Sequence, residues 1–434
     1  MVRYIFQITE WIIRLRKNTQ TLTTNPNQKE KTMSDRFLHG IEVIELDGSA
    51  HPVSTVASSV IGLVGTAPQG PVNKPTVITG NLIEAIDTFG EETDGFTIPT
   101  ALKGILEQTG AVVVVVNVAD PDNESHLGED DELDPDAITA TDIIGGVEAD
   151  GSYTGIQCLL AAQSECSVQP RILIAPGFTH QAGANSSANA VVTALLAVAD
   201  RLRATVVADC PNGTREQATA HQALFTSPRL YTVYPWAKVQ KGEDVVEEPL
   251  SARVAGLIAK SDNDRGFWWS PSNQEIKGII GLSKPIDFTL GDSQCVANYL
   301  NEHKVATVIQ QDGYRLWGNR TASTDTKWQF LSVRRTADMI NDSLLAAQLW
   351  AIDRNINRTY TEDVCESVNN YLRYLKNIGA IINGTCWADK NLNTPENIQL
   401  GNITFDFDFT PSFPAEHITF RSRLTNDYLE EIFE

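Results

Sequence analysis

The chain has 434 residues, of which 42% are hydrophobic and 21% charged, and its formal net charge is −21 at pH 7. These values are typical of a soluble globular protein with two or three packed domains, and the acidic excess disfavours a nucleic-acid-binding surface. No apolar run reaches the roughly eighteen residues of a membrane span, and the six scattered cysteines include no CxxC pair, which disfavours zinc sites and disulfides.

Residues 1–32 differ in character from the rest of the chain. They begin with the basic, mildly apolar stretch MVRYIFQITEWIIRLRKNTQ and continue with a polar one, without the apolar core or cleavage site of a secretory signal. Met33 then opens a globular pattern. Two interpretations stay open: translation starts at Met33, or residues 1–32 form a disordered basic leader with a short amphipathic helix.

The next elements are extended and then helical. Residues 37–56 include HGIEVIELDG, where apolar and acidic residues alternate as in a half-exposed strand. A continuous apolar strand is predicted at 60–66, and helices at 81–89 and 97–108, the second ending at Gly110.

From residue 111 to 236, buried strands alternate with amphipathic helices. Strands are predicted at 111–118, 171–177, 205–209 and 229–236, and helices at 155–163, 186–204 and 214–224. This alternation predicts crossover connections and a mainly parallel sheet covered on both faces, in a doubly wound α/β domain. The nine carboxylates of residues 120–136 lack the DxDxDG spacing of a calcium loop, so a solvated acidic loop is the interpretation favoured there.

Beyond Gly291 the pattern changes to α+β. A helix running into a strand is predicted over 293–310, a strand at 328–336, helices at 336–355 and 361–378, and strands at 402–409 and 417–424. In the helix at 361–378, five apolar residues form one stripe: Val364, Val368, Tyr371, Leu372 and Leu375. Four arginines of this region suit pairing with carboxylates, either between subunits or within the domain: Arg315, Arg320, Arg334 and Arg335.

An enzymatic function finds little support. The sequence has no GxSxG elbow, Walker loop, GxGxxG or HExxH, and no catalytic, cofactor-binding or metal-binding residues are predicted. His180 and His221 are the histidines placed inside the α/β region, and both are expected to be surface or helix residues.

Six stretches, taken together and in order, resemble tail sheath proteins of contractile phages, most closely those of P2-like phages and R-type pyocins. They are FLHGIEVIEL (37–46), STVASSVIGLVGTAPQGP (54–71), YRLWGNRT (314–321), SVRRTADMI (332–340), GTCWADKNLNTPENI (384–398) and ITFDFDFTPSFPAEHITFRSRLTNDYLE (403–430). The resemblance covers residues 37–430.

The resemblance implies an outer α/β domain of subtilisin-like topology inserted into an inner α+β domain that both chain ends build. The corresponding boundaries are a leader at 1–32, an N-terminal arm at 33–58, the outer domain at 59–290, the inner domain at 291–415 and a C-terminal arm at 416–434. It also implies arms that add strands to neighbouring subunits, and contraction from a metastable long state to a short one without nucleotide.

The predicted arm strands alternate apolar and polar residues, so one face can be buried while the other stays in water. On its own such a strand leaves its backbone hydrogen-bonding groups unpaired, and joining a sheet edge satisfies them. The predicted arm residues are His39, Gly40, Ile41, Glu42, Val43, Ile44, Ile418, Thr419, Phe420 and Arg421, and the receiving sheet carries Ile403, Phe405, Phe407 and Phe409. The alternative is an ordinary hairpin within one subunit.

A sheath must also hold its tube. Our hypothesis is that the helix at 361–378 offers its charged face to the tube, the alternative being a solvated face. The residues concerned are Glu362, Asp363, Glu366, Arg373 and Lys376.

The partners implied are further copies of the chain in hexameric rings stacked into a helix, the tail tube protein, the baseplate and the tail terminator, with no nucleic acid, small-molecule substrate or cofactor. The implied location is a virion tail or bacteriocin particle assembled in the bacterial host cytoplasm. Two other functions are weighed: an α/β hydrolase or nucleotide-dependent enzyme, and a sheath component of a type VI-like injection system.

Overall fold

A computed structural model of the chain describes residues 53–183 and 186–433. The predicted leader at 1–32 and the predicted arm residues 39–44 lie outside the described residues. Within the described part, no helix is both long enough and apolar enough to cross a bilayer.

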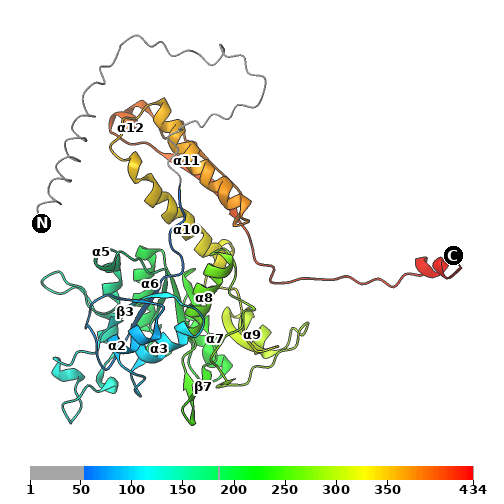
Figure 1. Cartoon of the computed structure of the whole chain (residues 1–434). Coiled ribbons are helices and arrows are strands. Elements are labelled where there is room, and N and C mark those ends of the chain that lie inside the picture. Colours follow the sequence, from blue (N-terminus) through cyan, green and yellow to red (C-terminus); the bar gives the residue numbers. More distant parts are fainter. Residues whose placement is uncertain (1–52, 184–185, 434) are drawn as a thin grey trace, which may run out of the picture. The chain divides into compact units, whose positions relative to one another are not determined.

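The largest element of the fold is an eight-stranded sheet with the order β11-β10-β6-β5-β4-β1-β3-β2 (Figure 1). Its six inner strands are parallel, and the edge strands β2 and β11 are antiparallel to their neighbours. The predicted mainly parallel α/β sheet is therefore confirmed. Its strands are β1 (Ile61–Gly65), β2 (Thr76–Thr79), β3 (Val112–Asn117), β4 (Ile172–Ile174), β5 (Thr205–Asp209), β6 (Leu230–Val233), β10 (Val305–Gln310) and β11 (Tyr314–Trp317).

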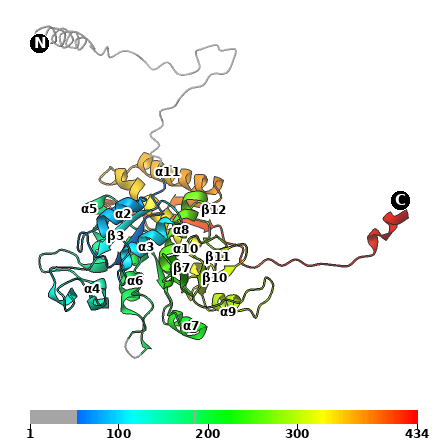
Figure 2. The same cartoon turned by 60° about the horizontal axis from the view of Figure 1, so that its bottom comes forward.

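Helices cover both faces of this sheet (Figure 2). In β3, Val113 and Val115 join the core on one face and Val114 and Val116 the core on the other, as the two-residue period of a strand requires. The continuous valine run thus reflects burial on both sides. One face carries α2 (Leu82–Phe89), α3 (Thr97–Leu106) and α8 (Ser251–Arg265), and the other carries α4 (Ala140–Ile144) and α6 (Ala190–Leu202).

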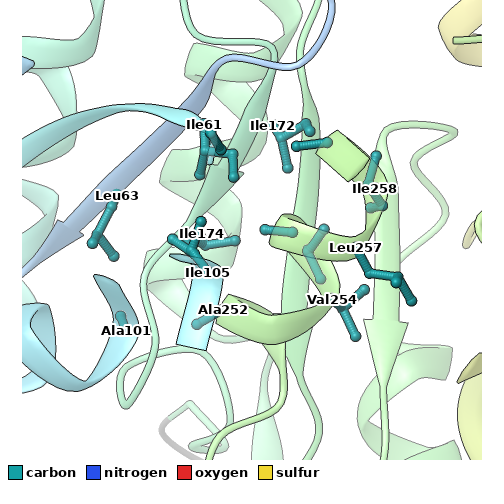
Figure 3. Packing of buried hydrophobic residues seen from close by; sticks show 14 of the residues in the cluster. Ile61, Leu63, Ala101, Ile105, Ile172, Ile174, Ala252, Val254, Leu257 and Ile258 are labelled. Atoms are coloured by element: carbon teal, nitrogen blue, oxygen red, sulfur yellow. The ribbon is translucent and has the colours of Figure 1, made fainter. Parts of the chain in front are cut away.

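Figure 3 shows the first of these cores, where α3 and α8 pack onto the strands. Gly256 lies where α8 meets α3, and a Cβ at this position would come within 2.7 Å of the Ile105 carbonyl oxygen. A glycine here therefore allows the close helix–helix approach. Residues labelled in the figure are Ile61, Leu63, Ala101, Ile105, Ile172, Ile174, Ala252, Val254, Leu257 and Ile258.

Some elements of the α/β part differ from the prediction. The helix expected at 155–163 is a 3₁₀ turn (Gly155–Leu160) followed by α5 (Ala162–Cys166), whereas the helix at 214–224 is found as α7 (Arg215–Ala223). The sequence did not predict the central helix α8, because polar residues such as Arg253 are buried in it and hide its apolar period. A small sheet of β7 (Ala237–Lys241), β8 (Asp244–Glu248) and β9 (Gly281–Leu282) was also not predicted.

The expected domain boundary at residue 291 falls inside the α/β sheet. After it come α9 (Val296–Glu302) and then β10 and β11, which extend the eight-stranded sheet beyond β6. The strand β10 is buried over Val305–Ile309, so its burial places it in this core and not in a separate domain.

The C-terminal region combines two long helices with a two-stranded sheet. The predicted strand at 328–336 is wrong, because α10 (Leu331–Ala347) begins there, and the predicted helix at 336–355 ends eight residues early. The stripe predicted for the next helix, α11 (Arg358–Asn377), is confirmed, since all five of its apolar residues are buried. The remaining elements are β12 (Ile381–Ala388), α12 (Pro395–Gln399) and β13 (Phe405–Pro411).

Candidate assembly interface

The first described residues of the chain pack against its C-terminal helices. Val53 and Val56 contact the hydrophobic cluster of α10, α11 and the β12–β13 sheet. The hydroxyl oxygens of Thr55 and Tyr371 lie 3.1 Å apart, and the backbone N–H of Val56 donates to Ser343 Oγ at 3.2 Å. Segments 287 and 316 residues apart in sequence therefore share one core, which agrees with the predicted pairing of the N-terminal segment with the C-terminal region.

The β12–β13 sheet is the candidate receiving sheet. Its strands pair antiparallel, and Phe405, Phe407 and Phe409 of β13 are half-buried against the cluster that contains α11. Asn369 of α11 holds β12, because its amide accepts from the N–H of Cys386 at 2.8 Å and donates to the Cys386 carbonyl oxygen at 3.0 Å. The sheet has two strands only among the described residues, so no further strand pairs with the outer edge of either, although Asn369 takes up the N–H and carbonyl of Cys386 on β12. Such an edge can accept a further strand.

Ile403, the other residue predicted for the receiving sheet, precedes β13 and is not part of it. The helix-facing side of β13 is therefore lined by the three phenylalanines.

The C-terminal tail beyond β13 is unpaired. The Ser412 N–H still donates to the Ala380 carbonyl, but residues 413–425 make no backbone–backbone hydrogen bond with the described residues. The strand predicted at 417–424 is absent from this single chain, because no sheet edge accompanies the segment. Ile418 and Phe420 are 67% and 92% exposed. An ion pair of 2.6 Å between Arg320 and Glu416 holds the start of the tail.

The unpaired tail excludes one alternative from the sequence. An ordinary hairpin between 402–409 and 417–424 is not formed, since residues 417–424 pair with no strand of the described chain. Neighbouring predicted arm residues Thr419 and Arg421 are exposed as well. The tail thus alternates apolar and polar side chains, and the described part of its own chain does not bury the apolar ones.

The residues predicted to contact a tube lie on the solvent side of α11. All five are exposed, and some are engaged in local pairs: Arg373 Nη2 lies 2.6 Å from Glu366 Oε1, Arg358 Nε lies 2.7 Å from Glu362 Oε1, and Lys376 donates to Asn383 Oδ1 at 3.2 Å. Exposed pairs of this kind contribute at most about 1 kcal/mol each, so a partner can rearrange them.

A buried cluster of charges, which we call the arginine seam, joins α10 to the sheet. It consists of Arg171, Arg203 and Arg229, which lie one or two residues before β4, β5 and β6, together with Asp338 and Asp342 of α10; Arg203 is the partly exposed member, with 37% of its side chain accessible. Since the three strands are parallel neighbours, their amino ends meet at one edge of the sheet. The two aspartates are four residues apart and face this edge from one side of α10.

Asp338 is the most heavily paired member of the seam. It accepts two hydrogen bonds from Arg229, at 2.6 and 3.0 Å, and two from Arg334, at 2.7 and 3.2 Å. Arg203 lies 2.8 Å from Asp342, which also contacts Arg171. Burial opposes the charge of Arg229, but its bonds to Asp338 outweigh this and raise its pKa. The charges of Asp338 and Arg229 are therefore paired within the chain, whereas burial raises the pKa of Asp342 and lowers that of Arg171.

The arginines singled out from the sequence are used inside the chain. Arg335 forms a buried ion pair with Asp262 of α8, in which Nη1 and Nη2 donate to the two carboxylate oxygens at 2.6 and 2.5 Å. Arg335 also donates to the Ser58 carbonyl oxygen at 3.1 Å. Arg334 joins the seam, Arg320 pairs with Glu416, and Arg315 donates to backbone carbonyls. The sequence left open whether these arginines pair between subunits or within the domain. In the single chain their partners lie within the chain itself. The partners Arg171 and Arg229 were missed, because no sequence signal distinguishes an arginine before a buried strand.

The buried polar groups at the other end of the sheet do not form a hydrolase site. Asp209, the last residue of β5, accepts directly from the Ser251 hydroxyl at 2.5 Å and from the Ser251 N–H at 2.8 Å, and burial raises its pKa to about 6. His221 is a helix residue of α7, one of the two placements expected; it is buried there, and burial lowers its pKa to about 4. His180 is half-buried with its ring edge against Trp236. No histidine stands between the serine and the carboxylate, as a catalytic triad requires.

The geometry thus defines a structural assembly subunit: an α/β domain tied by buried charges to a helical region that carries an open sheet and an unpaired tail.

Comparison with known proteins identifies the family. A family model described as the phage tail sheath protein central domain matches residues 151–322, and one described as the phage tail sheath C-terminal domain matches residues 323–425. A third, the tail sheath protein Gp18 domain III N-terminal region, matches residues 58–118.

Full-length relatives and solved structures agree. A prophage protein of Pseudomonas aeruginosa (strain UCBPP-PA14) named as a major tail sheath protein is 40% identical over 405 residues, 92% of this chain and 99% of the relative. The tail sheath protein of Escherichia phage P2 is 34% identical over 410 residues, covering 92% of this chain and 98% of the relative. The helical sheath of the anti-feeding prophage, solved in a contracted state, has the same fold, with a TM-score of 0.64 and 21% identity over 90% of this chain and 100% of that one.

The chain belongs to the phage tail sheath family, as its sequence resemblance indicated. It is a structural sheath protein of a contractile tail or tail-like particle and not an enzyme.

Proposed function

We propose that subunits of this sheath assemble by exchanging their terminal segments. Residues 416–434 of one subunit add a strand to the β12–β13 sheet of a second copy, and residues 39–44 add another. The observation that carries this proposal is an open two-stranded sheet in a chain whose own tail is unpaired and exposes Ile418 and Phe420.

The energetics favour addition of the tail to a sheet. Each backbone hydrogen bond gained contributes about 0.5–1.5 kcal/mol net, and burial of each large apolar side chain about 1.5–3 kcal/mol. An unpaired tail makes neither contribution, so a subunit becomes fully satisfied only beside another. This gain also has to exceed the repulsion between copies that each carry a net charge of −21.

The arms would then tie subunits together while the α/β domains change their contacts. The arginine seam and the Arg335–Asp262 pair connect α10 to the α/β domain with buried ionic bonds. A subunit connected in this way moves as one body, and the extended residues 413–425 provide the flexible link to the next copy. A rigid subunit body with a flexible link to its neighbour suits contraction from a metastable long sheath to a shorter one without nucleotide.

The remaining partners follow from the same proposal. Copies form hexameric rings stacked into a helix around a tail tube, with the exposed charges of α11 toward the tube, and the ends of the sheath meet the baseplate and the tail terminator. Assembly takes place in the bacterial host cytoplasm. Glu362, Asp363, Glu366, Arg373 and Lys376 are the residues proposed for the tube contact.

Removal of an arm tests the exchange. The variant lacking residues 419–434, and separately the one lacking residues 34–46, should stay folded but form no polymer, as judged by circular dichroism and negative-stain electron microscopy. Sheath-like tubes from either truncated protein would contradict the proposal.

A matched pair of substitutions tests the same point without deletion. Phe420→Glu places a charge on the predicted buried side of the added strand and should abolish tubes. Thr419→Glu, one residue earlier and on the opposite side of a strand, should still give tubes. Equal behaviour of the two variants would argue against strand addition.

A further inference from the structure

The two outer edges of the β12–β13 sheet differ in what they offer to a further strand. On β12, the Asn369 side chain of α11 donates to the Cys386 carbonyl oxygen at 3.0 Å and accepts from the Cys386 N–H at 2.8 Å. Cys386 lies opposite Phe407 of β13. In an antiparallel pair, residues opposite each other either exchange their backbone hydrogen bonds or both point outwards, so the backbone groups of Phe407 point to the outer edge of β13. A side chain therefore closes part of the β12 edge, whereas the β13 edge is open within the described chain.

The strand β13 has one apolar and one acidic face. Its three phenylalanines turn toward the hydrophobic cluster, so Asp406 and Asp408, which alternate with them, lie on the solvent face. Asp408 is exposed and accepts from the Thr385 N–H at 2.9 Å, and Asp406 is half-buried. The ion pairs of this part of the described chain join other residues, so both aspartates are without a cation there.

The tail has the complementary alternation. Residues 418–424 read ITFRSRL, in which Arg421 and Arg423 stand between positions of the opposite face. Both arginines are exposed and have no ion-pair partner within the described chain. A strand that turns its apolar side chains toward the β13 phenylalanines directs both arginines to the side of the β13 aspartates. The apolar side chains concerned are Ile418, Phe420 and Leu424, which are 67%, 92% and 101% exposed.

We propose that the tail of a second copy adds to the outer edge of β13, with Arg421 and Arg423 beside Asp406 and Asp408 on the solvent face. This inference rests on the strand exchange proposed above and assigns its edge and register. The two arginines and the two aspartates have the same spacing, so for either strand direction one register brings both pairs together. A shift by one residue moves every side chain to the wrong face, and a shift by two leaves one arginine and one aspartate unpaired.

The same charges disfavour the other strands that this edge could accept. The N-terminal arm carries Glu42 and Glu45, which would bring like charges to the acidic face of β13. The tail of the same chain is held at its start by the 2.6 Å ion pair between Glu416 and Arg320, which follows β11 of the α/β sheet, and it makes no backbone bond to its own β13. The edge thus selects the basic tail of another subunit.

Reversal of charge on either side of the contact tests the pairing in the full chain. One variant carries Arg421→Asp and Arg423→Asp, and the other carries Asp406→Arg and Asp408→Arg. Each alone should raise the lowest concentration that gives sedimentable tubes by at least about tenfold at low salt, because repulsion replaces attraction. Circular dichroism checks that both variants are folded, and the matched variant with Arg421→Lys and Arg423→Lys should assemble like the wild type.

An equal mixture of the two charge-reversed variants should assemble again, because each tail then meets a β13 strand of opposite charge on the other variant. Normal assembly of either variant alone would overturn the inference. So would a mixture that fails to assemble while one chain with all four reversals forms tubes, since the charges would then pair within one subunit.

The Phe420→Glu variant separates this inference from strand exchange itself. If Phe420→Glu blocks assembly and the charge reversals do not, strand exchange stands and the assignment to the β13 edge falls. Tubes formed by Phe420→Glu would contradict strand exchange and, with it, the charge pairing.

Discussion

The arginine seam makes a quantitative prediction about how α10 is held. Arg229 binds two aspartates of different exposure: the side chain of Asp338 is 2% exposed and that of Asp200 is 72% exposed. Replacement of Asp338 by asparagine keeps the shape but removes the charge that Arg229 and Arg334 share. Removal of one partner from a buried ion pair costs about 3–5 kcal/mol, because the remaining charges stay buried without compensation.

Asp200→Asn is the matched control, since it removes an exposed partner of the same arginine. Its nitrogen–oxygen distance to Arg229 is 2.9 Å, but an exposed pair contributes only about 0–1 kcal/mol. With an unfolding entropy of about 2 cal/mol/K per residue, Asp338→Asn should lower the melting temperature by about 3–6 °C, and Asp200→Asn by about 1 °C or less.

Thermal unfolding followed by circular dichroism, on variants at the same protein concentration, measures both values. Equal concentration matters because self-association stabilises the folded state by mass action. Equal losses from the two variants, or no loss from Asp338→Asn, would refute the idea that buried charges hold α10 to the sheet.

Three further perturbations have defined outcomes. The wild-type protein should lose about 2 kcal/mol of stability between pH 7 and 4.5, because an unfolded histidine binds its proton near pH 6.5 and the buried His221 only near pH 4. His221→Leu should remove this loss. The raised pKa of Asp209 acts in the opposite direction but is common to both proteins. Urea unfolding at the two pH values checks this, and an unchanged difference would contradict it. Reversal of charge at Arg373 and Lys376 should weaken co-sedimentation with the tail tube most at low salt, whereas unchanged binding at every salt concentration would exclude a charged contact there. Gly256→Ala should lower stability by about 1–3 kcal/mol through the clash with the α3 backbone, and a more stable variant in thermal unfolding would contradict the close helix approach.

The sequence predicted the elements whose burial has a simple period. The valine run of β3 and the stripe of α11 were found because apolar residues alone determine which faces are buried. The start of α10 was taken for a strand, because Arg335 is buried there and interrupts the apolar period with a charge, as Asp338 and Asp342 do further along the helix. Their partners are supplied by strands and helices far away in sequence, and no local pattern encodes such contacts.

The candidate interface shows the same division. The alternating pattern and the family resemblance identified the β13 phenylalanines and the tail. They did not predict whether these segments are paired or unpaired within a single chain. The sequence gives residues 417–424 the pattern of a strand, and the single chain lacks a sheet edge for them. A strand pattern without a strand is expected where the partner strand belongs to another molecule. The disagreement therefore supports the proposed function.

Hydrogen–deuterium exchange of residues 417–424, compared between the unassembled Phe420→Glu subunit and the wild-type polymer, tests strand addition most directly. We predict unprotected amides in the subunit and strong protection in the polymer, together with slower exchange along β12 or β13. Amides that stay unprotected in the polymer, or that are equally protected in the isolated subunit, would contradict the account.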